Sequence, residues 1–196
     1  MAERVQSGPQ QSRARRCSGA AQRTLDGEDR SERITGGRKG SLIPAYSPTK
    51  IPEFPNYLKS RPFVDPARIV ISACSYGGIQ TLLTGERDLG VKALVPFAPG
   101  AMSWEQNVAL QDRLVRAVDL AKAPVFLLQA ANDYSLAPSR VLSEEANKKK
   151  KDFQSKIYPA FGSTHQDGHW GFCSSATDVW GNDVLAFLET QMKASH

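Results

Sequence analysis

One serine in this sequence has neighbours that could make it a nucleophile. In residues 68–83, RIVISACSYGGIQTLL, a β-branched apolar run leads into small residues, Ser75, two glycines and then an apolar helical pattern. Ala73 lies two residues before Ser75, and Gly77 lies two residues after it. A strand that turns sharply into a helix needs small residues there, because a bulky side chain would collide with the following helix. The pattern therefore predicts a hydroxyl raised on a strand-to-helix turn, although Ser–Gly turns are common and the serine needs partners elsewhere.

A serine hydroxyl becomes nucleophilic when a base takes its proton and a third group orients that base. Asp133 follows the apolar run 125–130 within a few residues, so we expect it at the same sheet edge as Ser75. An ordinary turn aspartate is the alternative.

The base must come from three histidines, of which His196 is terminal. The other two, His165 and His169, lie in the predicted loop GSTHQDGHWGFCSS. We favour His169, because it lies closer to the last helix and between glycines that allow a sharp turn; for either histidine, a loop residue without a catalytic role is the alternative.

The three cysteines offer a different nucleophile. Cys74 precedes the predicted tip by one residue, so its side chain should point away from the tip into the sheet, where a thiol is inert. Cys173 is expected to be a packing residue as well. Because three cysteines cannot all pair within one chain and none shows CxxC spacing, we predict a reducing, cytoplasmic setting.

The elements that would position these residues alternate along the chain. Continuous apolar runs at residues 69–74, 93–98 and 125–130 are typical of buried parallel strands, and residues 154–158 form a fourth candidate. Helical patterns cover residues 79–86, 110–121 and 138–151, and a last helix carries Val184, Leu185, Leu188 and Met192. One short helix fits among the prolines near residues 56–60. The alternation predicts an α/β fold, a mostly parallel sheet flanked by helices.

Composition separates a basic N-terminal segment from the rest. The chain has 196 residues and a formal net charge of +5, and residues 1–40 hold nine basic and five acidic side chains. We predict that residues 1–45 are disordered, since they have no aromatic residue, and that residues 46–196 form the folded domain. The segment lacks the aromatic residues that stack on nucleic acid, and the chain has no apolar run of the ~18 residues that a membrane span needs. We therefore predict neither a nucleic acid nor a membrane partner.

Residues from about 57 to 188 resemble the dienelactone hydrolase-like branch of the α/β-hydrolases, which includes acyl-peptidase-like relatives. The resemblance rests on VDPARI before Ser75, KALVPFAPG, NDYSLAP and KIYPAFGSTHQDGHWGFC, and on the chain order serine, acid, histidine. It implies a partial α/β-hydrolase fold with Ser75 as nucleophile, Asp133 as acid, His169 as base and the backbone N–H of Tyr76 as half of the oxyanion hole. No metal or organic cofactor is implied.

Two departures from the family modify the expected function. The dienelactone hydrolases proper carry cysteine at the nucleophile position, so Ser75 favours a carboxylester or related acyl substrate. Family members also have strands upstream of the nucleophile strand, and residues 1–66 show none. We therefore expect an exposed sheet edge that invites self-association, and a missing oxyanion donor that lowers the rate by about 100- to 1000-fold. A catalytically silent interaction protein is the alternative function.

The substrate pocket is the least defined part of the prediction. Tyr134, Trp170 and Phe172 lie near the predicted acid and base and could line an apolar acyl pocket. Aromatic residues near a sheet edge are as often part of the core. Both interpretations stay open at this point.

Overall fold

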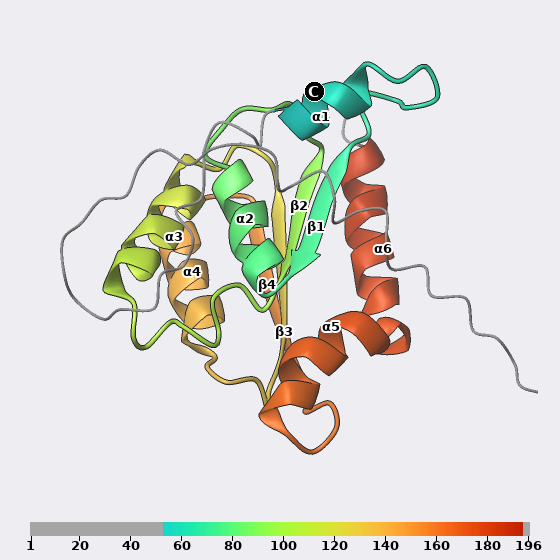
Figure 1. Ribbon diagram of the computed structural model, residues 1–196. Helices are drawn as coiled ribbons and strands as arrows, with labels where there is room; N and C mark the ends of the chain where they lie inside the picture. The colour runs from blue at the N-terminus through green and yellow to red at the C-terminus, as the bar shows by residue number, and fades with distance from the viewer. Residues whose placement is uncertain (1–52, 194–196) are drawn as a thin grey trace, which may run out of the picture. The chain divides into compact units, whose positions relative to one another are not determined.

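The structure, a computed structural model, describes residues 53–193 (Figure 1). The predicted disordered segment 1–45 lies outside the described residues. Within them, four parallel strands form one sheet in the order β1-β2-β3-β4, the same as their order in the chain. The strands are β1 (Val70–Cys74), β2 (Ala93–Phe97), β3 (Val125–Ala130) and β4 (Phe153–Tyr158). This arrangement confirms the predicted parallel α/β sheet.

Helices cover both faces of the sheet. A short helix, α1 (Glu53–Lys59), precedes the sheet, and α2 (Tyr76–Thr84), α3 (Val108–Leu120) and α4 (Ala137–Lys148) lie on one face. The other face is covered by α5 (Phe172–Ser175) and α6 (Thr177–Lys193), which follow a π-helical turn, η1 (Asp167–Gly171). The short helix predicted near residues 56–60 is confirmed in type, although it begins earlier. No helix among residues 53–193 is long and apolar enough to cross a bilayer.

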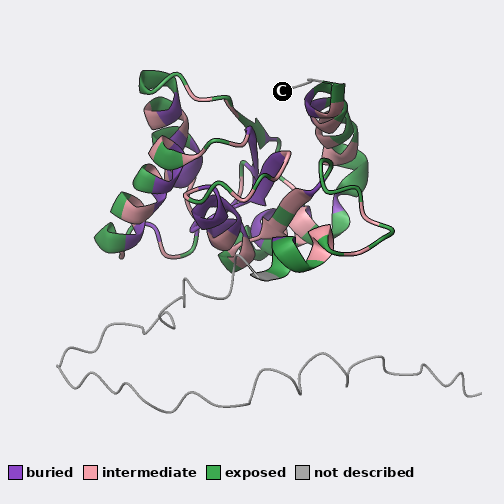
Figure 2. Ribbon diagram, turned by 90° about the horizontal axis from the view of Figure 1, so that it is seen from above, coloured by how far each residue is buried: buried purple, intermediate pink, exposed green. Residues whose placement is uncertain are grey.

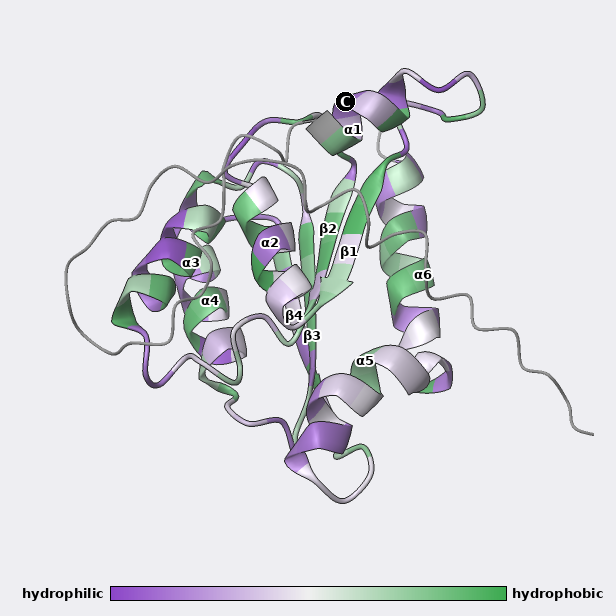
Figure 3. Cartoon of the chain, in the orientation of Figure 1, coloured by the Kyte–Doolittle hydropathy of each residue, from purple (hydrophilic) through white to green (hydrophobic). Residues whose placement is uncertain are grey.

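The two faces of the sheet build two hydrophobic cores. One core joins α2, α3 and α4 to the sheet around Leu82, Leu114 and Leu142, and the other joins α5 and α6 to it around Phe172 and Phe187. Strands β2 and β3 are buried along their whole length, whereas β1 and β4 are partly exposed (Figure 2). Figure 3 shows the same pattern as hydrophobic colour in the central strands. The buried strands read as continuous apolar runs because helices cover both of their sides.

The two outer strands differ in their chemistry. Within the described residues, β1 and β4 are the edges of the sheet. Strand β4 carries Lys156, whose ammonium pairs with Asp183 on α6 at 2.6 Å, while β1 carries no charged side chain. A charge on an edge strand discourages pairing with another chain. The edge formed by β1 lacks that protection.

The segment before the last helix differs from its prediction. Residues 162–175 were expected to form a loop, but residues 167–175 are helical. The Asp167 carboxylate begins this helical segment by accepting the backbone N–H groups of Ser163 and Thr164, each at 3.0 Å. Phe172 anchors it by packing against Phe97 and Tyr158 in the core. The glycine content that favoured a loop was outweighed by this capping and burial.

Candidate active site

Ser75 lies on the turn between β1 and α2, as the sequence predicts. Its backbone has φ 56°, a left-handed conformation that is uncommon for a residue with a side chain, and its N–H donates to the carbonyl oxygen of Phe97 at 2.9 Å. The turn is tight: a Cβ at Gly77 would lie 2.7 Å from Ala73 Cβ, and one at Gly78 would lie 2.6 Å from the Phe97 oxygen. The pair of glycines therefore allows the strand to turn into the helix and lifts Ser75 above the sheet.

The structure brings Ser75, Asp133 and His169 together. His169 Nε2 lies 2.7 Å from Ser75 Oγ, and His169 Nδ1 lies 2.8 Å from Asp133 Oδ1. The Asp133 carboxylate can only accept, so Nδ1 carries the proton and Nε2 is free to accept from the serine hydroxyl. The side chains of Asp133 and His169 are 0% and 3% exposed, so water does not compete for the hydrogen bond between them.

His165, the alternative histidine, occupies a different position. Its side chain is exposed, and its Nδ1 lies 2.9 Å from the backbone oxygen of Asn132 rather than near the serine. Of the two histidines, His169 is the one that the structure places between the serine and the acid.

Two residues that the sequence analysis did not single out hold this arrangement. Asn132 Nδ2 donates to the carbonyl oxygens of Phe161 and Thr164, each at 2.9 Å, and so joins the loop that carries Asp133 to the segment that carries His169. Gln129, next to the last residue of β3, donates through Nε2 to Asp133 Oδ2 at 2.8 Å. A polar residue inside the buried run VFLLQA was the signal that could have identified Gln129.

Asp167, the first residue of the helical turn that carries His169, is stabilised in its charged form. Hydrogen bonds from the Thr164 side chain and from the backbone N–H groups of Ser163 and Thr164 hold the pKa of Asp167 below its ordinary value. The partly exposed Asp167 carboxylate therefore caps the helical segment of His169 in its charged form.

Comparison with known proteins identifies the family. Residues 48–191 match the dienelactone hydrolase family. The chain belongs to that family. Its members are hydrolases, and the parallel sheet with a serine at its carboxyl edge agrees with this assignment. No curated protein matches the sequence.

Solved structures show the same fold as this dienelactone hydrolase family protein. The Pyrococcus furiosus esterase has TM-score 0.53 and 14% identity over 70% of this chain and 58% of its own. The Pyrococcus horikoshii acylaminoacyl peptidase has TM-score 0.52 and 18% identity, over 72% of this chain and 27% of its own. The Mycobacterium tuberculosis puromycin-hydrolyzing peptidase has TM-score 0.53 and 23% identity, over 69% of this chain and 24% of its own. The chain thus spans about a quarter of each peptidase.

The aromatic residues predicted to line a pocket divide into two groups. Tyr134 is 42% exposed and Trp170 is 54% exposed, and the Tyr134 ring meets the His169 ring edge to face at 5.5 Å. Phe172 is 0% exposed and packs in the core. The core alternative is therefore the correct one for Phe172, because the helical turn after His169 points it toward the sheet.

The structure places the two predicted packing cysteines next to each other. Cys74 and Cys173 lie side by side, with Cα atoms 6.1 Å apart, and both pack against the core that α5 and α6 form with the sheet. Sequence separation hid this proximity, because the two positions are 99 residues apart. This contact joins the end of β1, directly before Ser75, to α5, which follows His169.

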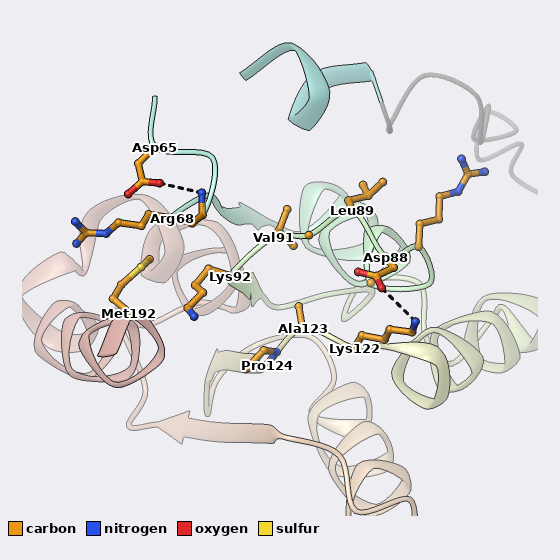
Figure 4. Close-up of a pocket in the computed structure, with 14 residues that line it drawn as sticks. Asp65, Arg68, Asp88, Leu89, Val91, Lys92, Lys122, Ala123, Pro124 and Met192 are labelled. Atoms are coloured by element: carbon orange, nitrogen blue, oxygen red, sulfur yellow. Dashed lines mark hydrogen bonds and ion pairs between the residues drawn. The ribbon is translucent and has the colours of Figure 1, made fainter. Parts of the chain in front are cut away.

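A cavity of about 810 Å³ lies at the other end of the sheet (Figure 4). It is lined by residues that precede the strands, including Arg68 before β1, Lys92 before β2 and Pro124 before β3, and the Lys122–Asp88 ion pair at 3.2 Å borders it. Ser75 follows β1 at the carboxyl edge, so this cavity is not part of the candidate active site. Among residues 53–193, no group of three or more potential ligands is placed to hold a metal ion.

Proposed function

We propose that this dienelactone hydrolase family protein is a serine hydrolase that cleaves carboxylesters or related acyl bonds with Ser75, His169 and Asp133. The observation that carries the proposal is the position of the buried His169 ring, 2.7 Å from Ser75 Oγ on one side and 2.8 Å from Asp133 Oδ1 on the other. This is the geometry that activates a serine hydroxyl at neutral pH.

The proposed reaction has two halves. Ser75 Oγ attacks the acyl carbon while His169 Nε2 takes the hydroxyl proton, and the same proton then passes to the leaving alcohol or amine. The departure of that group leaves an acyl ester on Ser75. Water attacks this ester with His169 as base, and the proton returns to Ser75 when the acid product leaves. Asp133 keeps the proton on Nδ1 throughout.

The oxyanion that forms during each attack needs donors. The backbone N–H of Tyr76 lies in the first turn of α2, where a helix offers no partner of its own, and we assign it to the oxyanion. Within residues 53–193, no strand pairs with the free edge of β1 to bring a second donor from that side. A site with one donor in place of two turns over about 100- to 1000-fold more slowly, so we expect weak activity.

The exposed aromatic side chains beside the site support a substrate with an apolar acyl group. Tyr134 contacts the His169 ring, so it lies close to the reacting atoms. Trp170 follows His169 directly in the chain, and its side chain is exposed. We propose that the acyl chain of the substrate packs against these two rings.

Labelling by a fluorophosphonate probe tests the function. The probe bonds covalently to an activated serine, so the full chain should be labelled and Ser75→Ala should not. Ser72→Ala is the matched control, because it removes a hydroxyl from the same strand that faces away from the site and donates to the Val95 carbonyl oxygen at 2.9 Å. A folded sample without labelling would reject the proposal and favour the alternative, a catalytically silent interaction protein.

A further inference from the structure

One buried polar side chain lies behind the proposed acid. Gln129 is the polar residue of β3, VFLLQA, and it is 0% exposed among leucine, valine and phenylalanine neighbours. Burying an amide is unfavourable unless its polar atoms find partners. Gln129 therefore contributes to stability only through the hydrogen bonds that it makes.

Those bonds fix the orientation of the amide. Gln129 Nε2 lies 2.8 Å from Asp133 Oδ2 and 2.7 Å from the carbonyl oxygen of Ser135. Both oxygens can only accept, so the nitrogen of the amide must face them. The oxygen, Oε1, then faces Ser139 Oγ at 2.5 Å and accepts a hydrogen bond from that hydroxyl. Ser139 is 1% exposed, so this bond is shielded from water as well.

The Asp133 carboxylate is thereby held at both oxygens. Oδ1 accepts the backbone N–H of Tyr134 at 2.7 Å and faces His169 Nδ1, while Oδ2 accepts from Gln129. In the part of the chain that the structure describes, Gln129 is the only donor to Oδ2. Rotation about the last bond of an aspartate is soft, so a carboxylate without this donor can turn away from the histidine.

We propose that Gln129 is a positioning residue that locks the Asp133 carboxylate toward His169, with Ser139 holding Gln129 in turn. The proposal rests on the function assigned above. Gln129 touches neither Ser75 nor the substrate side of the site, so its effect passes through Asp133. Its loss should lower kcat for an ester such as p-nitrophenyl acetate and leave KM unchanged.

Gln129→Met tests this role, because methionine keeps the length of the side chain and removes the donor. We expect kcat to fall by about 10- to 100-fold, the effect of one hydrogen bond to a charged group. The low-field proton resonance of the His169 N–H that donates to Asp133 should broaden or shift. Gln191→Met is the control, a buried glutamine on α6 outside this chain of contacts, and it should keep the kcat and the resonance of the wild type.

The outcomes separate this inference from the function itself. Gln129→Met with unchanged kcat and an unchanged resonance would overturn it. If that variant does not fold, Ser139→Ala decides: a lower kcat with unchanged KM supports the inference, and wild-type kinetics reject it. If the wild type has no esterase activity, the proposed function is wrong, and the His169 N–H resonance alone tests the positioning role of Gln129. A resonance present in the wild type and lost in Gln129→Met supports positioning, whereas its absence from the wild type rejects it.

Discussion

Both polar atoms of the Asn132 side chain bond the backbone of Phe161: Nδ2 donates to the carbonyl oxygen and Oδ1 accepts from the N–H, each at 2.9 Å. Asn132 immediately precedes Asp133, and Phe161 begins the segment that leads to His169. The proposed acid and base come from segments that are 36 residues apart, and this paired contact fixes one segment against the other.

Asn132→Ala should weaken both stability and activity. The substitution removes three hydrogen bonds to the Phe161 and Thr164 backbone, so we expect the free energy of unfolding to fall by about 1–3 kcal/mol. The labelling rate at Ser75 should fall as well, because His169 loses its fixed position. Urea unfolding and timed labelling measure the two effects. Asn147→Ala, at an exposed position on α4, should change neither, and equal effects from both variants would contradict the role of Asn132.

The two histidines should differ sharply in their importance. His169→Ala removes the proposed base, so we expect ester turnover to fall by at least about 10⁴-fold. His165→Ala removes a ring that binds the Asn132 carbonyl oxygen at the surface, and turnover should stay within a few-fold of the wild type. Steady-state kinetics of both variants provide the test. Loss of turnover in His165→Ala alone would exchange the two assignments.

The glycine that follows the turn should not tolerate a methyl group. In Gly78→Ala, the new Cβ would lie 2.6 Å from the Phe97 carbonyl oxygen, so we expect a loss of about 1–3 kcal/mol in the free energy of unfolding. Gly181→Ala is the control, because its Cβ would meet only Thr177 Cγ2 at 3.5 Å within α6. Alanine favours a helix over glycine, so that variant should gain up to about 1 kcal/mol. Thermal unfolding compares the two, and similar melting temperatures would refute the close contact at Gly78.

Acid should destabilise the segment that carries His169 through Asp167. The pKa of Asp167 is lowered by the Thr164 side chain and by two backbone N–H groups, so its charged form is favoured more in the folded state than in the unfolded one. This stabilisation is complete above the ordinary aspartate pKa of about 3.9 and is lost as the pH falls through the lower folded value.

Asp167→Asn should therefore flatten the dependence of stability on pH below about pH 4. Urea unfolding of the wild type and the variant between pH 6 and pH 3 measures this difference. Thr164→Val keeps the carboxylate and removes the largest cause of the shift, so its pH dependence should lie between the two. Parallel curves for all three proteins would show that Asp167 does not contribute.

The uncharged edge of β1 should support self-association between two copies of this chain. Ser72 lies at the centre of β1 and is exposed, and we expect Ser72→Lys to shift the protein toward monomer, because a lysine on an edge strand opposes pairing. Gln154→Lys places the same charge on β4, which already carries Lys156, and should leave the association unchanged. Sedimentation velocity over a range of concentrations distinguishes these outcomes. A wild type that remains monomeric, or equal effects of the two variants, would exclude pairing through β1.

The sequence by itself determined the four strands, most of the helices and the position of Ser75. Apolar runs placed β3 at its observed bounds and β1 and β2 within one residue of theirs, because strands covered by helices on both faces are largely apolar. The fourth candidate, residues 154–158, lies within one residue of the more exposed β4. The small residues Ala73, Gly77 and Gly78 identified the turn, since their requirement is local. The helical segment after residue 166 was missed, because the cap by Asp167 and the burial of Phe172 in the core outweigh the glycines that suggested a loop.

Only the tertiary structure decided which distant residues meet. His169 and Ser75 are 94 positions apart, and Cys74 and Cys173 are 99 apart, so no local pattern relates them. Whether these residues meet in space depends on how the four strands align at the carboxyl edge of the sheet. The same packing selects His169 over His165 and gives Gln129 its partner in Asp133. Such contacts depend on several elements packing at once, whereas periodicity along the chain reports only how each element meets the core.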